Sequence, residues 1–168
     1  NYYLSHYLVL IFVDVARMEL SQKSWEMNKI VVKTIKRAYQ NWKPNPLIRC
    51  YHYAAAFNGN KMIAFAKNNP IKFNAKAYRM GEMFNIDTYK EYPYPHAESH
   101  LVSKLLDRYN TINSSWKIVV LRINREGRLL LSKPCRNCQK ILDALDLKNI
   151  YYSDNNGNFI SGLPKQAR

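Results

Sequence analysis

Two short segments, well separated in the chain, carry side chains of the kinds that bind zinc. The first is His96-Ala97-Glu98, which holds an imidazole and a carboxylate, and the second is Pro134-Cys135-Arg136-Asn137-Cys138, which holds two thiols. One imidazole and two thiolates leave the fourth position of a tetrahedral zinc ion open for water. A chain built on this pattern has to fold so that the two segments meet across the 35 residues between Glu98 and Pro134.

The pattern resembles the signature of the zinc-dependent cytidine and deoxycytidylate deaminase superfamily. That signature is His or Cys, one further residue and Glu, followed by Pro-Cys-x-x-Cys. The resemblance spans roughly residues 48–160. It implies that His96, Cys135 and Cys138 bind Zn²⁺ and that Glu98 is the catalytic residue, which carries protons without binding the metal.

The same resemblance implies residues that bind the substrate. The backbone N–H of Ala97 and the backbone carbonyl of Ser132 or Lys133 would orient the base. Residues 68–71 read Asn-Asn-Pro-Ile and resemble the Asn-x-Pro-Ile segment of tRNA adenosine deaminases. This implies that Asn68, or alternatively Asn69, hydrogen-bonds the base or the sugar. The other interpretation is a plain turn before a proline.

Other interpretations of the cysteine motif leave Glu98 without a role. A structural zinc site is normally completed by a fourth protein ligand, and a redox Cys-x-x-Cys pair needs no His-x-Glu element. A zincin metalloprotease has its Glu immediately after the first His, whereas here Ala97 intervenes. His100 lies one helical turn after His96, but the two cysteines already complete the set of protein ligands.

Hydrophobic periodicity and turn signals predict the individual helices and strands. The resemblance implies that they form a three-layer α/β/α cytidine-deaminase-like fold around a mixed sheet of about five strands, with zinc at the N-termini of two helices. Ser21 is a plausible N-cap for a first helix that ends before Pro44. Further helices are predicted at Met80–Ile86, His96–Tyr109 and Cys135–Leu145. Strands are predicted at Ile48–Phe57, Lys61–Ala66, Trp116–Ile123, Arg128–Leu131, Asn149–Ser153 and Asn158–Ser161.

The last two predicted strands are separated by only four residues, Asp154-Asn155-Asn156-Gly157. A parallel crossover needs a dozen residues or more, so this pair is expected to form an antiparallel C-terminal β-hairpin. Such a hairpin resembles the free-cytidine and toxin-type deaminases. It differs from the deoxycytidylate, tRNA-adenosine and APOBEC-type enzymes, in which a helix separates the final strands.

The chain is predicted to hold one deaminase-like domain over residues 18–168, preceded by an N-terminal extension over residues 1–17. Met18 is a candidate start of the domain. The apolar run at residues 7–13 is much shorter than the ~20 residues that cross a bilayer, so no membrane association is expected. The three cysteines form no disulfide framework. An intracellular, cytoplasmic location is therefore expected, and the resemblance fits a phage or bacterial source.

The charge of the chain favours polyanionic partners. It has 26 Lys and Arg against 12 Asp and Glu, a formal net charge of +14. The long connection at residues 74–95 combines basic and aromatic side chains, which suit phosphates and stacked bases respectively. The candidate contacts to phosphate and base are Lys76, Arg79, Tyr89 and Tyr92, and Tyr94 is expected to contact the substrate.

These observations predict hydrolytic deamination of cytosine to uracil on a phosphate-bearing substrate, either single-stranded DNA or RNA or a nucleotide such as deoxycytidylate. A free-cytidine enzyme typically has Asn-x-Glu after its second strand to hold the ribose, whereas here Pro70 follows Asn68. One alternative is an adenosine deaminase that acts on nucleic acid. The other is a catalytically silent deaminase-like module that binds nucleic acid.

Overall fold

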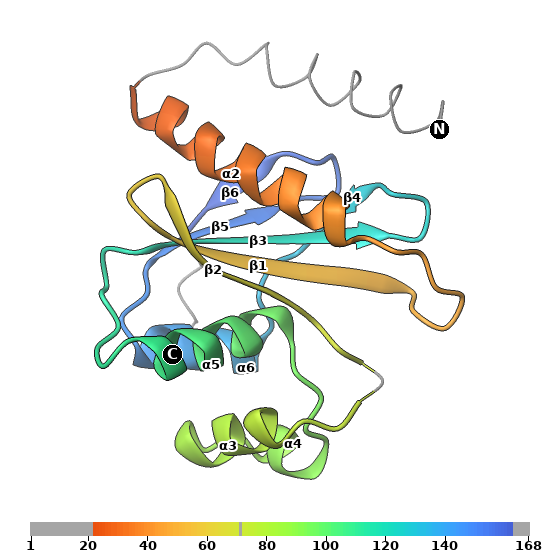
Figure 1. Ribbon diagram of the computed structural model, residues 1–168, viewed down its shortest axis with the longest axis vertical. Helices are drawn as coiled ribbons and strands as arrows, with labels where there is room; N and C mark the ends of the chain where they lie inside the picture. The colour runs from red at the N-terminus through yellow and green to blue at the C-terminus, as the bar shows by residue number, and fades with distance from the viewer. Residues whose placement is uncertain (1–21, 71, 163–168) are drawn as a thin grey trace.

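A mixed β-sheet forms the centre of the protein in the computed structural model, which describes residues 22–70 and 72–162 and, for residues 22–26, the backbone only. The sheet has the strand order β2-β1-β3-β5-β6, and β4 pairs with the end of β3 (Figure 1). Only β3 and β5 pair in parallel among these strands. Their bounds are β1 (Cys50–Asn58), β2 (Lys61–Lys67), β3 (Lys117–Asn124), β4 (Leu129–Leu130), β5 (Asn149–Ser153) and β6 (Phe159–Ser161).

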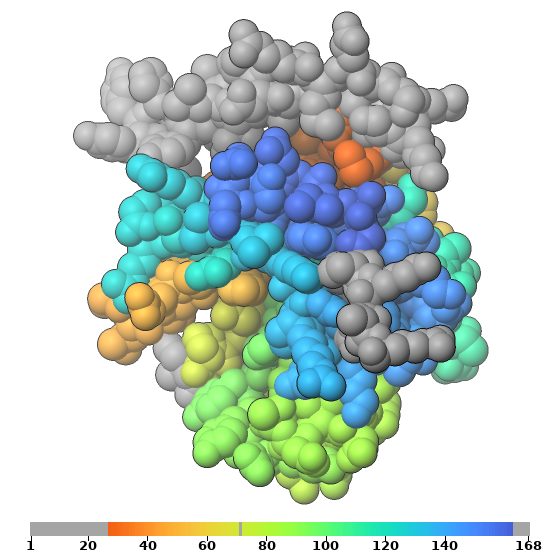
Figure 2. All heavy atoms as spheres, turned by 180° about the vertical axis from the view of Figure 1, so that it is seen from behind, coloured from red at the N-terminus to blue at the C-terminus, as the bar shows by residue number. Residues whose placement is uncertain are grey.

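Helices cover both faces of this sheet (Figure 1). The first, α2 (Gln22–Asn41), lies on one face, and α5 (Ala97–Arg108) and α6 (Arg136–Ala144) lie on the other. Beyond α5 and α6 lie α3 (Ala75–Met83) and α4 (Asp87–Glu91), which form the lower end of the molecule in the view from behind (Figure 2). The predicted three-layer arrangement, the mixed sheet and the antiparallel β5–β6 hairpin are confirmed.

Alternation along β1 divides the apolar residues between two cores, one on each face of the sheet. Tyr51, Tyr53 and Phe57 belong to the core under α2, whereas Ala54 and Ala56 belong to the core that α5 and α6 cover. Successive side chains of a strand point to opposite faces, so a central strand with both faces covered is apolar nearly throughout. The small alanines leave room for α5 to lie close to the sheet.

The segment between residues 74 and 95 forms two helices, and the predicted helix at Met80–Ile86 is wrong in its position. The Asn74 side chain accepts a hydrogen bond from the Lys76 backbone N–H, which starts α3 earlier than expected. The helix ends at Met83, and Asn85, the residue after the C-cap, has a left-handed φ of 51°. The Ile86 N–H donates to the Gly81 carbonyl at 2.8 Å. This arrangement is a Schellman motif, in which Asn85 occupies the position usually taken by Gly.

The hairpin predicted around Asn58-Gly59-Asn60 is confirmed, since β1 and β2 pair antiparallel on either side of it. Gly59 has a φ of 56°, which a two-residue hairpin turn requires. The predicted N-cap Ser21 and the boundary between residues 17 and 18 lie outside the described residues. In the part of the chain that is described, no helix is both long enough and apolar enough to cross a membrane.

Candidate metal centre

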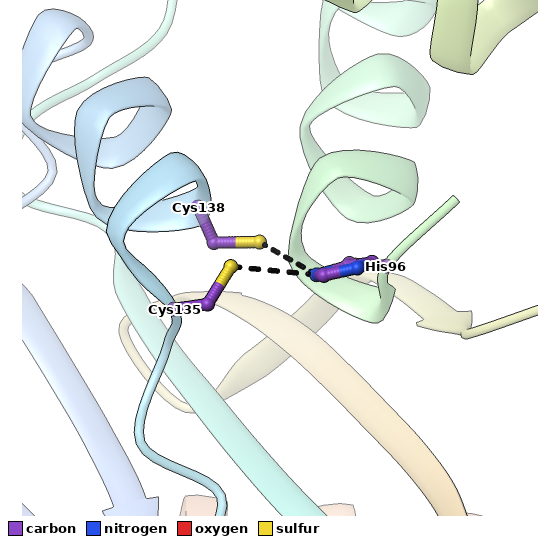
Figure 3. A group of neighbouring side chains, drawn as sticks. All are labelled: His96, Cys135 and Cys138. Atoms are coloured by element: carbon purple, nitrogen blue, oxygen red, sulfur yellow. Dashed lines mark hydrogen bonds between the residues drawn. The ribbon is translucent and has the colours of Figure 1, made fainter. Parts of the chain in front are cut away.

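His96 and Cys135 occupy equivalent places, each at the residue just before a helix begins. His96 is the N-cap of α5, and Cys135 is the N-cap of α6. Neither side chain caps its own helix, and both point into the space between the two helices (Figure 3). Cys138 lies one helical turn after Cys135 and points to the same place. The two segments that the sequence analysis singled out therefore meet.

The three side chains form one candidate metal-binding group. Their ligand atoms all lie within 4.8 Å of one another. His96 Nδ1 lies 3.5 Å from Cys135 Sγ and 3.5 Å from Cys138 Sγ. A tetrahedral zinc ion with Zn–N of about 2.0–2.1 Å and Zn–S of about 2.3 Å places N and S about 3.6 Å apart. The spacing and the donor set both fit a zinc ion with three protein ligands.

The thiols and the imidazole influence one another strongly. A hydrogen bond with Cys138, assisted by His96, lowers the pKa of Cys135 to about 4. The same thiol–thiol bond and burial raise the pKa of Cys138 well above its ordinary value. The hydrogen bond to Cys135 raises the pKa of His96. Cation binding needs deprotonated ligands, so metal uptake would release the Cys138 proton.

Glu98 lies beside this group without belonging to it. It is the second residue of α5 and only 4% exposed. Burial raises the pKa of its carboxyl group, which also interacts with its own backbone N–H, with His96 and with Cys138. A buried carboxyl next to a candidate metal centre is placed to accept and return protons there.

Tyr89 supports two of the three candidate ligands from α4. Its hydroxyl lies 3.3 Å from Cys138 Sγ, and its ring meets the His96 ring edge-on at a centroid distance of 5.5 Å. Tyr89 is only 3% exposed. The sequence predicts this residue among the contacts to phosphate and base. The structure instead places it behind the ligands, where its side chain is covered.

The predicted substrate residues Asn68, Ala97 and Ser132 lie at different depths around the centre. Asn68 uses its side-chain oxygen to accept from the His52 backbone N–H at 3.0 Å, and the following Asn69 N–H donates to the Pro95 carbonyl, just before His96. Ala97 is fully buried at the start of α5. Ser132 is 2% exposed, and its hydroxyl donates to the Val120 carbonyl, which is a structural contact.

Four further predicted contacts lie on the surface. Tyr92 and Tyr94 are 67% and 41% exposed, and Tyr94 lies two residues before His96. Arg79 is exposed on α3. Lys76 pairs with Asp107, ten residues after Ala97 in α5 and about 15 Å along the helix axis from it. Tyr94 is therefore close to His96 in the sequence and exposed, whereas Lys76 lies at the far end of α5.

His52 is a residue near the site that the sequence analysis missed. It belongs to β1 and pairs in register with Arg122 of β3. Burial, and then the Arg122 guanidinium, lowers the pKa of His52 to about 4, and the charges of His96 and Cys135 also act on it. Strand alternation predicts that His52 shares a face with Ala54 and Ala56. No motif in the sequence indicates that this face ends at the metal centre.

Comparisons of this chain with protein-family models and with curated proteins find no match. The fold and the site by themselves define a mixed α/β protein with a candidate His-Cys-Cys metal centre at the N-termini of two neighbouring helices.

Proposed function

We propose that this protein is a zinc-dependent hydrolytic deaminase of the cytidine deaminase superfamily, which converts cytosine to uracil on a phosphate-bearing substrate. The observation that carries the proposal is the burial of Glu98 beside His96, Cys135 and Cys138. A structural zinc site has no use for a buried carboxyl that is not a ligand. In the ligand group that the described residues form, three side chains leave one tetrahedral position open.

In the proposed reaction, Glu98 moves the protons. A zinc ion held by His96 Nδ1, Cys135 Sγ and Cys138 Sγ would supply Lewis-acid activation of a water molecule. The Glu98 carboxylate takes a proton from the water and delivers it to the ring nitrogen N3, while the water oxygen bonds to C4. Glu98 then passes the second proton to the departing amine. Water and cytosine thus become uracil and ammonia.

The choice of cytosine rests on the antiparallel β5–β6 hairpin, which resembles the free-cytidine and toxin-type deaminases. The choice of a phosphate-bearing substrate rests on the net charge of +14 and on the exposed rings of Tyr92 and Tyr94, which precede His96 in the sequence by four and two residues. Cationic surfaces bind phosphates, and exposed aromatic rings stack on bases. Single-stranded DNA or RNA and cytidine nucleotides both meet these requirements.

A mass-spectrometric deamination assay tests the proposal. Zinc-loaded protein is incubated with cytidine, deoxycytidine, their monophosphates and single-stranded oligonucleotides, and Glu98→Gln is the control variant. We expect a gain of about one mass unit on cytosine, lost in Glu98→Gln while bound zinc stays at one equivalent. Equal turnover by the wild type and Glu98→Gln would contradict the assigned role of Glu98.

Other results of this assay would identify the alternative functions. A mass gain on adenine alone would indicate an adenosine deaminase that uses the same residues. Zinc bound at one equivalent without turnover of any substrate, together with oligonucleotide binding that Glu98→Gln does not change, would indicate a silent nucleic-acid-binding module. Either result would overturn the cytosine proposal.

A further inference from the structure

Three side chains spaced four residues apart on α5 bond to every second carbonyl of β2. His100 Nδ1 lies 3.0 Å from the Lys67 carbonyl oxygen, Lys104 Nζ donates to the Phe65 carbonyl at 2.8 Å, and Arg108 Nη1 donates to the Ile63 carbonyl at 2.6 Å. We call His100, Lys104 and Arg108 the α5 ladder.

The ladder forms because two periods nearly coincide. Four residues of an α-helix rise about 6 Å, and two residues of a β-strand rise about 6.6 Å. The strand β2 is at the end of the sheet and pairs only with β1 among the described strands, and α5 packs against it (Figure 1). The ladder therefore satisfies carbonyls that a sheet edge leaves exposed.

Edge capping uses only part of what these side chains offer. A Lys ammonium has three N–H donors and an Arg guanidinium has five, so Lys104 and Arg108 keep donors and full positive charge after bonding to β2. The neighbouring carboxylate, Asp107, pairs with Lys76. Burial, and then the positive charges of Lys76 and Arg108, lower the pKa of Lys104. The local field around Lys104 is therefore positive.

The ladder borders a groove on the surface. The groove has a volume of about 450 Å³, and its lining residues are Ala64, Phe65, Lys104, Asp107 and Arg108. Both cationic side chains are exposed there. The one carboxylate among these lining residues, Asp107, pairs with Lys76. An open groove that presents two cationic side chains suits a chain of phosphates better than a neutral ligand.

The ladder begins next to the metal centre. His100 lies one turn after His96 along α5. The Asn69 N–H, two residues after Lys67, donates to the Pro95 carbonyl, so the end of β2 lies beside the start of α5. Along the helix axis, Lys104 is about 12 Å and Arg108 about 18 Å from His96. A single nucleotide whose base reaches the metal centre cannot also place a phosphate at both cations, whereas a polynucleotide can.

From this geometry we propose that the phosphodiester backbone of a single-stranded nucleic acid lies along the α5 ladder, with its phosphates against Lys104 and Arg108. One part of the proposal rests on the proposed function, namely that the bound strand is deaminated, since the ladder leads to the residues assigned to deamination. Binding itself does not depend on that chemistry. The proposal makes the substrate a polynucleotide rather than a free nucleotide.

The test measures binding of a fluorescein-labelled oligothymidylate, which contains no cytosine, to the full chain by fluorescence anisotropy. In Lys104→Gln/Arg108→Gln, each amide keeps an N–H donor for β2 and loses the charge. The matched control is Lys33→Gln/Arg37→Gln on α2. Both of its cations are exposed, they have the same four-residue spacing, and Lys33 also donates to a backbone carbonyl, that of Asn60.

We expect the Lys104→Gln/Arg108→Gln variant to bind about tenfold more weakly than the wild type at about 50 mM salt. The negative slope of log affinity against log salt should become less steep by about 1.4, because each of the two phosphate contacts contributes about 0.7. The α2 variant should match the wild type in both quantities. A charge-retaining swap, Lys104→Arg/Arg108→Lys, should restore the wild-type slope. This swap, together with unfolding midpoints, separates lost charge from a damaged fold.

Equal binding by the ladder variant and the α2 variant would overturn the proposal. If both variants then still deaminate a cytidine monophosphate, the proposed function stands without the ladder. Conversely, if no cytosine substrate is deaminated but the ladder variant alone loses binding, the ladder proposal stands and the proposed function fails.

Discussion

The hydroxyl of Tyr89 lies 3.3 Å from Cys138 Sγ, and this contact links α4 to the most deeply buried of the three candidate ligands. A second contact between the same parts of the chain joins Asn137 Nδ2 to Thr88 Oγ1 at 2.7 Å. The position of the metal centre therefore depends on α4 as well as on α5 and α6. A hydroxyl that donates to a thiolate stabilises its charged form, which is the form that binds metal.

Tyr89→Phe is expected to weaken zinc binding by about tenfold, because removing a group that supports a metal ligand typically costs 10–100-fold in affinity. Competition with a chromophoric chelator measures this. The control is Tyr92→Phe, the same change three residues away on an exposed side chain. If both variants compete as well as the wild type, Tyr89 does not support the metal centre.

Gly81→Ala is expected to destabilise the protein by on the order of 1 kcal/mol, although the same change inside most helices is stabilising. An added Cβ at Gly81 would lie 3.0 Å from the Lys90 backbone N, 3.0 Å from Tyr89 Cβ and 3.1 Å from the Ile86 carbonyl oxygen. Two of these are backbone atoms, so α4 would have to move and take Tyr89 with it.

Urea unfolding and the chelator assay together check the Gly81→Ala prediction. Zinc affinity should fall along with stability, because the displaced Tyr89 no longer reaches Cys138. Glu82→Ala, at the exposed neighbouring position of α3, should leave both quantities unchanged. A more stable Gly81→Ala protein with wild-type zinc affinity would show that α4 adapts without cost.

The ligand group could be predicted because its two segments match the deaminase signature, which implies that His96, Cys135 and Cys138 bind one ion. Spacing supports part of this, since two residues between Cys135 and Cys138 place both thiols on one turn of a helix. The β5–β6 hairpin could likewise be predicted from the length of its turn.

The residues that surround the ligands could not be predicted in the same way. Tyr89 has its role because α3 packs against α5 and α4 while α4 contacts α6. The ends of α3 are set by an Asn74 cap and a left-handed Asn85, which are weak signals in the sequence. His52 is a single histidine in an otherwise apolar strand. Its nearness to His96 arises from the sheet order and from where α5 begins, and neither is a local property of the chain.

Ser132→Ala is expected to lower the free energy of unfolding by about 2–3 kcal/mol. The Ser132 hydroxyl donates to the Val120 carbonyl at 2.8 Å and accepts from the Ser153 backbone N–H at 2.9 Å, and these contacts are buried. Its removal leaves a buried donor and acceptor unpaired, at about 1–3 kcal/mol each. Urea unfolding measures the loss, with Ser115→Ala on the surface as the control.

The outcome for Ser132→Ala also separates structure from substrate binding. The resemblance assigns only a backbone carbonyl, that of Ser132 or Lys133, to the base, and Ser132→Ala keeps both carbonyls. Deamination by the folded variant should therefore remain within about twofold of the wild type. A large loss of turnover without any loss of stability would reverse this assignment and make the hydroxyl a substrate contact.

His52 should make the metal-free protein less stable as the pH falls. Its folded-state pKa is about 4, below the ordinary value of 6.5. Between these values the unfolded chain binds a proton that the folded protein does not, so stability is lost as the pH falls from 6.5 towards 4. From pH 7 to pH 5 the loss should be on the order of 2 kcal/mol. Urea unfolding in EDTA at the two pH values measures it.

His52→Gln is the variant that isolates this contribution, because it removes the titrating ring and keeps the backbone N–H that donates to Asn68. The remaining groups titrate in both proteins, so the quantity of interest is the difference between the two pH dependences. The His52→Gln protein should lose less stability than the wild type between pH 7 and pH 5. Equal losses would mean that the His52 ring is protonated as readily in the folded protein as in the unfolded chain, and hence that it is not held neutral beside Arg122 and the metal centre.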